Sequence, residues 1–441
     1  MSRILELVAE RAVPGGRMLA RHDGRIVLVA GAIPGERVRA RVERISKHTV
    51  WARVAGPGDV IESSPDRRET ASDPACGGSV YAHIAYERQL LLKGEILADA
   101  FRRIGHVTLA SPPSVSGSPA GGYRMRSRLH VRDGRAGFFR EGTHVLCDAG
   151  ATGQILPEAA AAAARVVAIL GEHGRACDAI IVSENAAATE RVMHVEAREG
   201  QRLDDVFDDL AAIDLETAGL TGVTALDGGD VLELAGDALV RDTSATLAPH
   251  AAALPAVSWA RRPTSFFQGN RHMTGTLLER VLQLAEGRRC VDLYAGVGLF
   301  SVPLAASGRQ VVAVESESSS FEDLDLNAAP WRESLETVRA TVEAWLAGAA
   351  SAGDVCVVDP PRTGMTDDAV AALVRLRPPR LVYVSCDPPT LARDAAKLSA
   401  AGYVLASIEG FDLFPNTAHV ETVAVFTAGQ SAAALPLEPG R

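Results

Sequence analysis

From about residue 274 onward, short apolar segments alternate with segments of helical spacing, and this alternation constrains the fold more than any other feature of the chain. The apolar segments are Cys290–Leu293, Gln310–Val314, Val355–Val358 and Leu381–Val384. Strands that alternate with helices build βαβ units, which place parallel strands in one sheet with helices on its faces. The sequence therefore predicts an α/β domain with an open parallel sheet over residues 263–428.

The first 60 residues follow a different pattern, in which short runs alternate between apolar and polar side chains. Turn signals separate these runs, at Gly15-Gly16, Asp23-Gly24 and Pro34-Gly35. This arrangement predicts a small β-barrel. Arg37, Arg39 and Arg41 alternate along one predicted strand and therefore share a face. That face is either a solvated strand surface or a surface that contacts phosphates, as on an OB-type barrel.

The region between these two parts has mixed character. Residues 61–74 are polar and are typical of a linker, and residues 82–105 have helical spacing. A second basic strand is predicted at 124–132, where Arg124, Arg126, Arg128 and Arg132 are evenly spaced. We expect a central α+β domain over 75–262 and a disordered tail over 429–441.

The charge of the chain is unevenly distributed. The net charge is −10, but residues 1–140 contain 23 Lys and Arg against 14 Asp and Glu, a balance of +9, which leaves −19 for the other 301 residues. Such asymmetry can mark a face that binds a polyanion such as nucleic acid, although surface charge also varies without function.

Neither the N-terminus nor the cysteines indicate secretion. The first 16 residues carry four charged side chains and no apolar core of a signal peptide, and no apolar run approaches the length that spans a bilayer. We expect a soluble, cytoplasmic protein with no membrane association. The six cysteines are scattered and form no CxxC pair, so neither a zinc site, nor any other metal site, nor a disulfide framework is predicted.

The sequence of residues 290–300, CVDLYAGVGLF, predicts a strand, a Gly-rich loop and the start of a helix. Gly296 and Gly298 allow the backbone to approach a ligand closely. Glu315 ends the next strand, 19 positions after Gly296, where a carboxylate can accept both hydroxyls of a ribose. Two ligands compete for this pattern, a dinucleotide and S-adenosylmethionine. The absence of a third loop glycine favours S-adenosylmethionine.

Two further motifs end strands of the same predicted sheet. Asp359-Pro-Pro-Arg362 follows one strand, and Cys386 follows the next. Because ligands of open α/β sheets bind outside the carboxyl ends of the strands, we expect both motifs to face one crevice. The Pro-Pro pair could instead only stiffen a loop, and free cysteines are more often buried and inert than reactive.

A cysteine beside a methyl-donor site suggests covalent methylation of a pyrimidine. Carbon 5 of this ring is too weak a nucleophile to attack a sulfonium methyl group, but addition of a thiolate at carbon 6 makes carbon 5 enolate-like. A general base must then remove the carbon 5 proton before the thiolate leaves. Glu421 lies in an apolar run, where burial would raise its pKa toward that of a useful base. Alternatively, Glu421 is a surface charge at the edge of a strand.

These motifs together resemble those of the RNA uracil-5-methyltransferases, the bacterial 23S rRNA and tRNA 5-methyluridine enzymes. The matching segments are Phe267–Asn270, Asp292–Phe300, Asp359–Arg362, Ser385–Pro388 and His419–Thr422. The N-terminal part resembles the TRAM domain, an OB-like RNA-binding barrel, at Gly15-Gly16 and Gly31–Glu36. The resemblance implies three parts: a Rossmann-like S-adenosylmethionine-dependent methyltransferase domain, the TRAM barrel and a central α+β domain.

The resemblance also implies roles for individual residues. Cys386 would be the nucleophile and Glu421 the base, and the target uridine would be flipped out of its RNA into the crevice. The residues that would line the S-adenosylmethionine site are Gln268, Tyr294, Gly296, Glu315 and Asp359. The barrel and the basic strand at 124–132 would hold the RNA backbone, and no obligate protein partner is implied.

The chain departs from the family pattern at three places. The rRNA enzymes often hold a [4Fe-4S] cluster on four cysteines, but here Ser79 replaces the second Cys of a C-G-G-C pair, which leaves Cys76 and Cys147. Two ligands cannot hold the cluster in the usual way, so no iron–sulfur centre is expected. Asp387 stands where the family usually has Asn, and its charge would oppose thiolate formation at Cys386. Glu343 is a candidate for the acid usually found after the third strand.

We therefore predict an enzyme that methylates carbon 5 of a uridine, with rRNA a more probable substrate than tRNA. Cytosine is a weaker alternative, because RNA cytosine enzymes use a second cysteine near the Asp-Pro-Pro loop and Cys356 lies within a strand. A non-catalytic RNA-binding protein that kept the fold is a second hypothesis. A small-molecule methyltransferase is a third, which leaves the basic N-terminal third unexplained.

Overall fold

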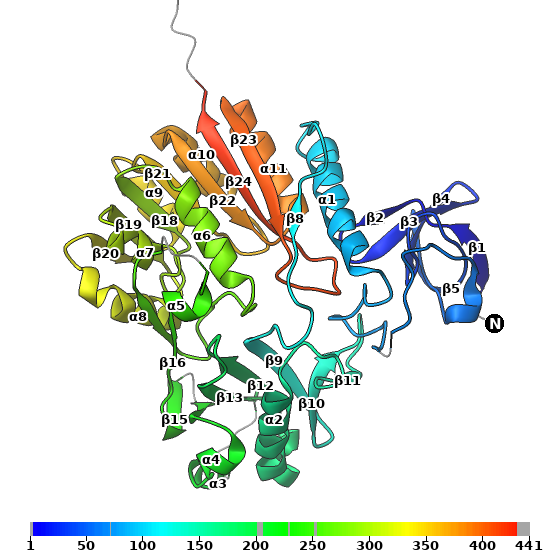
Figure 1. The fold of residues 1–441 in the computed structure, drawn as a ribbon, viewed down its shortest axis with the longest axis horizontal. Helices are drawn as coiled ribbons and strands as arrows, with labels where there is room; N and C mark the ends of the chain where they lie inside the picture. Colours follow the sequence, from blue (N-terminus) through cyan, green and yellow to red (C-terminus); the bar gives the residue numbers. More distant parts are fainter. Residues whose placement is uncertain (1–2, 71, 201–205, 228–229, 251–253, 430–441) are drawn as a thin grey trace, which may run out of the picture.

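A computed structural model describes residues 3–70, 72–200, 206–227, 230–250 and 254–429. Figure 1 shows three parts: a barrel at the N-terminus, a central sheet, and a larger sheet flanked by helices that ends the chain. The predicted disordered tail, beyond Gly429, lies outside the described residues.

The N-terminal part is a seven-stranded antiparallel and parallel sheet that closes around its own core. Its order is β1-β5-β6-β4-β3-β2, with β7 paired to β5. The strands are β1 (Ile4–Val8), β2 (Arg11–Val13), β3 (Arg17–His22), β4 (Arg25–Ala30), β5 (Arg37–Ile45), β6 (Thr49–Arg53) and β7 (Val60–Glu62). In β5 Val38 and Ala40 are buried while the alternating arginines are exposed, as the period-2 pattern predicts.

Helix α1 (Tyr86–Arg103) lies between the barrel and the C-terminal sheet (Figure 1). Leu92 and Ile96 pack in the core of the barrel, whereas Ala100 and Phe101 pack in a core of the C-terminal sheet. A single amphipathic helix therefore joins the two cores.

The central part is a seven-stranded sheet of order β11-β10-β9-β12-β13-β14-β15. Its strands are β9 (Arg126–Arg132), β10 (Arg135–Phe139), β11 (Leu146–Asp148), β12 (Cys177–Glu184), β13 (Arg191–Ala197), β14 (Gly222–Asp227) and β15 (Asp230–Gly236). Helix α2 (Pro157–Leu170) packs on this sheet through small residues, Ala159, Ala162 and Ala163, and the short helices α3 (Phe207–Ala211) and α4 (Leu215–Ala218) follow.

The C-terminal part confirms the predicted α/β fold. Its eight-stranded sheet has the order β20-β19-β18-β21-β22-β24-β23-β8, and the first five of these strands are parallel. The strands are β8 (Val115–Ser116), β18 (Arg289–Leu293), β19 (Gln310–Glu315), β20 (Leu335–Arg339), β21 (Val355–Val358), β22 (Arg380–Ser385), β23 (Tyr403–Phe411) and β24 (Glu421–Ala428). The helices are α6 (Thr274–Leu284), α7 (Ser301–Ala306), α8 (Ser318–Ala328), α9 (Val342–Gly348), α10 (Asp367–Leu376) and α11 (Pro388–Ala400).

The segment just before residue 262 packs with the C-terminal part. Strands β16 (Val240–Thr243) and β17 (Ser258–Arg261), with helix α5 (Ser244–Leu247) between them, form a two-stranded sheet. Trp259 is fully buried in the core of the large sheet, and its indole N–H donates to the carbonyl of Gly298 over 3.0 Å. We therefore propose that the boundary between the central and C-terminal domains lies before β16, rather than at residue 262.

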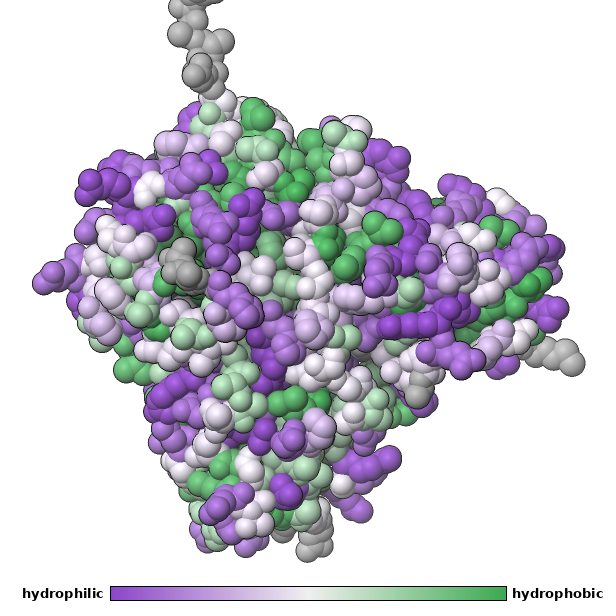
Figure 2. Space-filling model, viewed as in Figure 1, coloured by the Kyte–Doolittle hydropathy of each residue, from purple (hydrophilic) through white to green (hydrophobic). Residues whose placement is uncertain are grey.

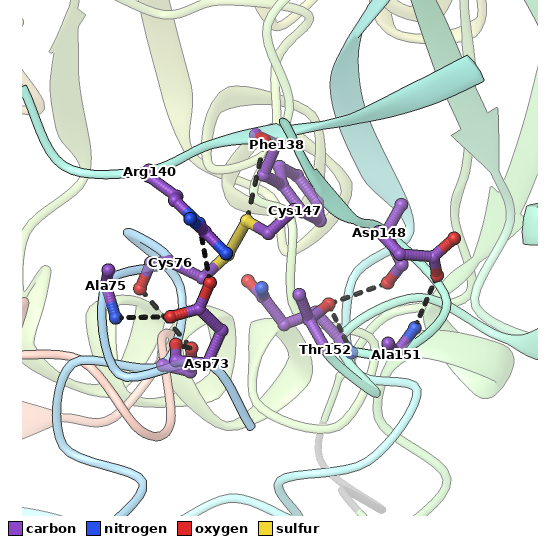
Figure 3. Close-up of a disulfide and its surroundings, with 12 residues drawn as sticks. Asp73, Ala75, Cys76, Phe138, Arg140, Cys147, Asp148, Ala151 and Thr152 are labelled. Atoms are coloured by element: carbon purple, nitrogen blue, oxygen red, sulfur yellow. Dashed lines mark hydrogen bonds and ion pairs between the residues drawn. A yellow bond between two sulfur atoms is a disulfide. The ribbon is translucent and has the colours of Figure 1, made fainter. Parts of the chain in front are cut away.

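One pair of cysteines overturns an expectation. Cys76 and Cys147, 71 positions apart, form a disulfide (Figure 3). The sequence could not reveal it, because only the pairing of β10 with β11 brings Cys147 next to the segment that carries Cys76.

Within the described residues, no helix combines the length and the apolar character that crossing a bilayer requires.

Candidate active site

The predicted site residues gather at one edge of the C-terminal sheet. Because β18, β19, β21 and β22 are parallel, the residues at their carboxyl ends meet there. Strand β24 runs in the opposite direction, so its first residue lies at the same edge. The side chains brought to this edge are Tyr294, Glu315, Asp359, Cys386 and Glu421.

Cys386 and Glu421 face each other across the β22–β24 pair. Ser385 is the register partner of Thr422, so the residue that follows Ser385 lies beside the residue that precedes Thr422. Cys386 is half-buried, unlike the other three free cysteines of the described residues, which are buried. Burial, followed by the charge of Glu421, raises the pKa of the Cys386 thiol to about 12. Without substrate, the thiol therefore holds its proton.

Glu421 is a buried acid. The alternative that the sequence left open, a surface charge at the edge of a strand, is therefore wrong. It is 2% exposed, and burial, followed by the charge of Asp359, raises its pKa well above the ordinary value. Burial also raises the pKa of Asp359, to about 7, against a hydrogen bond from Gln268 (Nε2 to Oδ2, 3.4 Å) that lowers it. The structure thus brings Gln268, Asp359 and Glu421 together. The raised pKa of Glu421 is a property expected of a general base.

The Gly-rich loop closes on Glu315. The backbone N–H of Gly296 donates to Glu315 Oε2 over 2.9 Å, while Glu315 Oε1 accepts from the N–H groups of Ser316 and Glu317, both over 2.7 Å. Gly296 has φ +56°, which suits glycine, but Tyr294 has φ +63° in the same loop. A positive φ at a tyrosine is uncommon and costs about 1–3 kcal/mol, and such strain is concentrated at ligand sites.

Asp292 is a further candidate for the site, to which the sequence gave no role. It is fully buried in β18, accepts a hydrogen bond from the Ser301 hydroxyl, and leaves Oδ1 without a partner among the described residues. Burial, together with the nearby charges of Asp359 and Glu315, raises its pKa to about 7. An unpaired buried acceptor, a strained loop and a carboxylate at the end of β19 fit the adenosine, ribose and sulfonium groups of S-adenosylmethionine.

Arg362 supplies the positive charge at this edge. Its side chain is exposed, and its charge lowers the pKa of both Cys386 and Glu421. The sequence marked Arg362 only as the last residue of the Asp-Pro-Pro-Arg motif. Its place at the end of the Asp-Pro-Pro segment makes it a candidate for stabilising the thiolate or a negative charge on the bound base.

Asp387 has a structural role that the sequence did not predict. Its carboxylate caps helix α11 by accepting from the N–H of Thr390 over 2.9 Å. Its charge does raise the pKa of Cys386, as expected, but less than burial and the charges of Glu421 and Asp359 do. The other uncertain acid, Glu343, lies in the first turn of α9 and accepts from the Thr366 hydroxyl over 2.7 Å.

A buried polar network, also absent from the prediction, holds the segment that leads to Glu421. The Lys93 ammonium and the Asp412 carboxylate form a fully buried ion pair, and Tyr86 donates to Asp412 Oδ2 over 2.8 Å. Asn270 donates to the carbonyl of Leu413 over 3.0 Å. These contacts tie α1 and the Phe-Gln-Gly-Asn segment to residues 411–420, and so fix the start of β24.

Cavity size does not identify the site. A cavity of about 790 Å³ lies beside β16 and β17, away from the strand ends, and its wall includes Thr243, Trp259, Asn327 and Trp331. The chemistry at the strand ends is the basis of the assignment instead, because a thiol, neighbouring buried acids and the Gly-rich loop are found there.

The arginines of the two predicted basic faces differ in whether they pair with carboxylates. On β9, Arg128 pairs with Asp178 and Glu196, both over 2.7 Å, and Arg132 pairs with Asp178 over 3.0 Å. Two of the four arginines of this predicted strand are therefore paired with carboxylates, which weakens its predicted role as a phosphate-binding face. On β5, Arg39 and Arg41 are exposed and have no carboxylate within ion-pair distance among the described residues. Figure 2 shows the barrel, at the right, as a largely hydrophilic surface.

Known proteins match both ends of this chain and its whole length. Residues 6–55 match the TRAM domain, and residues 348–428 match the family described as tRNA (Uracil-5-)-methyltransferase. The 23S rRNA (uracil(1939)-C(5))-methyltransferase RlmD of Alkalilimnicola ehrlichii is 33% identical over 93% of this chain and 94% of its own. RlmD of Pseudomonas putida is 32% identical over 95% of this chain and 93% of its own.

A solved structure shares the fold. The tRNA (uracil-54, C5)-methyltransferase of Pyrococcus abyssi, in complex with S-adenosyl-L-homocysteine, superimposes with a TM-score of 0.74 at 25% identity, covering 96% of this chain and 99% of that one. Its bound product is what S-adenosylmethionine becomes after methyl transfer. The fold, the acids and thiol at the strand ends, and relatives above 30% identity over nearly the full length agree. The chain therefore belongs to the S-adenosylmethionine-dependent RNA uracil-5-methyltransferase family.

Proposed function

We propose that this protein transfers the methyl group of S-adenosylmethionine to carbon 5 of a uridine in 23S rRNA, with Cys386 as nucleophile and Glu421 as base. The single observation that carries the proposal is the placement of Cys386 beside Glu421 at the cofactor edge of the sheet. The rRNA substrate is supported by the RlmD relatives and by the match to the TRAM domain.

S-adenosylmethionine supplies an electrophilic methyl group. The Cys386 thiol would release its proton to solvent, and its sulfur would bond to carbon 6 of the uracil, which places electron density on carbon 5 and on the carbonyl oxygen at carbon 4. Carbon 5 would then take the methyl group, with S-adenosylhomocysteine as the leaving group. Once carbon 5 carries the methyl group, Glu421 accepts the carbon 5 proton, and the electrons of that bond expel the Cys386 thiolate. Arg362 would stabilise negative charge during addition and elimination.

The protonation states of the buried acids affect these reaction steps. In the free protein, burial raises the pKa of Glu421 well above its ordinary value, which disfavours the carboxylate form that must act as the base. Glu421 and Asp359 would ionise more readily beside a cationic sulfonium, because opposite charge favours the carboxylate form. The base would thus become competent only when the methyl donor is in place. Gln268, Tyr294, Gly296, Glu315 and Asp359 are the residues we propose for the donor site.

Methyl transfer from tritiated S-adenosylmethionine to unmodified RNA tests the proposal. Unmodified 23S rRNA should become labelled at carbon 5 of uridine, and the Cys386→Ala variant should not label it. Labelling of tRNA alone would instead favour the tRNA alternative, which the matching family's name and the archaeal neighbour support. Binding without labelling would indicate a non-catalytic RNA-binding protein, and labelling of a small molecule alone would exclude an RNA substrate.

The remaining parts would serve RNA binding. We propose that the barrel (1–60) contacts RNA through Arg39 and Arg41, that the central domain begins near residue 75, and that the protein works in the cytoplasm, where rRNA is available. No obligate protein partner is required by this chemistry.

A further inference from the structure

We propose that the Cys76–Cys147 disulfide is a redox-dependent crosslink that fixes the segment 73–79, which the barrel contacts, to the central sheet. The bond closes a loop between residues 71 positions apart, with Cα atoms 6.1 Å apart, as disulfides require. Cys76 is fully buried and Cys147 is 8% exposed. The crosslink thus lies inside the protein, where exchange with a solution thiol requires a local opening.

The disulfide anchors a short segment along the edge of the central sheet (Figure 3). Cys76 forms a β-bridge with Arg140, and the N–H of Glu141 donates to the carbonyl of Ala75 over 2.8 Å. The Arg140 guanidinium pairs with Asp73 over 2.7 Å. Residues 73–79 therefore lie against the β10–β11 hairpin, and the disulfide is their covalent attachment to β11.

The same segment meets the barrel. Glu141, next to Arg140, accepts from Arg17 over 3.1 Å and from Arg53 over 2.8 Å. Both arginines also pair with Glu43, over 2.9 Å and 2.6 Å, and Arg53 donates to the carbonyl of Pro74 over 3.4 Å. Strands β3 and β6 of the barrel therefore contact Glu141 and Pro74, which lie in the two segments that the disulfide joins. Loss of the bond would loosen these barrel contacts as well as the segment 73–79.

The residues here do not fit the iron–sulfur cluster that the family resemblance implies. Their two sulfur atoms are bonded to each other, and the Ser79 hydroxyl donates to the carbonyl of Asp73 over 2.7 Å. Across the described ranges, no group of three or more His, Cys, Asp or Glu side chains could hold a metal ion. A covalent bond between two side chains takes the place of a four-ligand cluster.

The redox step balances with glutathione. Two glutathione molecules supply two electrons and two protons, which leaves Cys76 and Cys147 as thiols and forms one oxidised glutathione; the reverse step uses oxidised glutathione as the oxidant. Reduction removes the loop constraint, so the unfolded state gains entropy and the segment 73–79 opens more often.

Thiol counting on the full-length protein tests the bond itself. The protein is alkylated as cells are lysed, then denatured without reductant, and its free thiols are counted by mass spectrometry. We expect four alkylated cysteines, two more after reduction, and one crosslinked peptide pair that contains Cys76 and Cys147. Six alkylated thiols before reduction, or stoichiometric bound iron, would overturn the proposal.

Stability and hydrogen exchange test what the bond does. Reduced wild-type protein and the Cys76→Ser, Cys147→Ser and double variants should all melt at the same temperature, about 5–10 °C below the oxidised protein. Amides of residues 73–79 and of the barrel strands that carry Arg17 and Arg53 should exchange about tenfold faster. The Cys177→Ser variant, which removes a buried free thiol of the same sheet, should keep the full response to reductant. Unchanged melting and exchange after reduction would refute the crosslink role, and neither readout depends on methyl transfer.

Discussion

Cys386 and Glu421 lie side by side because an antiparallel strand was added to a parallel sheet. Strand β22 delivers the thiol at its carboxyl end, and β24, running the other way, begins with the acid. The two groups therefore reach one edge of the sheet from opposite chain directions. After burial, the charge of Glu421 is the largest cause of the raised pKa of the Cys386 thiol, and burial raises the pKa of Glu421 itself.

Replacement of Glu421 by Gln should separate the two halves of the reaction. Methyl transfer to carbon 5 needs Cys386, but release of the product needs removal of the carbon 5 proton. Turnover should fall about 10²–10⁴-fold, and a tritium-labelled RNA–protein adduct that survives denaturing electrophoresis should accumulate. The matched variant Glu409→Gln, in neighbouring strand β23, should turn over normally. Full turnover by Glu421→Gln would remove Glu421 as the base.

Replacement of Asp359 by Asn should stabilise the protein without ligand, and more so at high pH. The folded-state pKa of Asp359 is about 7 against 3.8 for the free group, so the folded state holds a proton that the unfolded chain has lost. The stability from this proton is present below about pH 3.8 and is lost as the pH rises through 7. The gain for Asn should be about 1–3 kcal/mol at pH 8 and smaller at pH 5.

Chemical denaturation at the two pH values measures this difference. Asp367→Asn is the control, because the pKa of exposed Asp367 is lowered by a hydrogen bond from Lys397, and it should bring no gain at pH 8. A loss of stability for Asp359→Asn at pH 8 would contradict the burial argument.

Replacement of Lys93 by Met should strongly destabilise the protein. It leaves the carboxylate of Asp412 buried without its cation, which costs about 3–5 kcal/mol. The double variant Lys93→Met, Asp412→Leu should recover much of the stability in denaturant unfolding. Its methyl transfer should remain slow, since residues 411–420 lose their anchor to α1. A single variant as stable as the wild type would mean that the pair contributes nothing.

Replacement of Arg39 and Arg41 by Gln should weaken RNA binding. The loss should be about tenfold, with a slope of log affinity against log salt that is smaller by about 1–2, because two phosphate contacts are removed. Arg37→Gln is the matched control on the same strand, since Arg37 already pairs with Glu6 and Glu62. An equal effect of all three substitutions, or none, would place the RNA elsewhere.

The sequence predicts the sheet and its site because both depend on local signals. Apolar runs mark β18, β19, β21 and β22, and residues that follow parallel strands must meet at one edge. Strand β20 was missed because its sequence, Leu-Glu-Thr-Val-Arg, is half polar. It lies at the edge of the sheet, where such a composition is tolerated.

What could not be predicted depends on contacts between distant segments. Lys93 and Asp412 are 319 positions apart, and the disulfide joins residues 71 apart. The ion pairs of Arg128 and Arg132 could not be predicted either, because Asp178 and Glu196 lie on other strands, whose places in the sheet the sequence does not give.

The most direct test of the account is covalent capture of RNA by Cys386. Uridine RNA in which fluorine replaces the carbon 5 hydrogen cannot lose a proton there, so the adduct should persist. With S-adenosylmethionine, wild-type protein should form a stable complex, and peptide mapping should find the nucleotide on Cys386. The control Cys356→Ala, which removes a buried cysteine of β21, should form the same complex. Adduct formation by Cys386→Ala, or none by an active wild-type enzyme, would contradict the covalent mechanism.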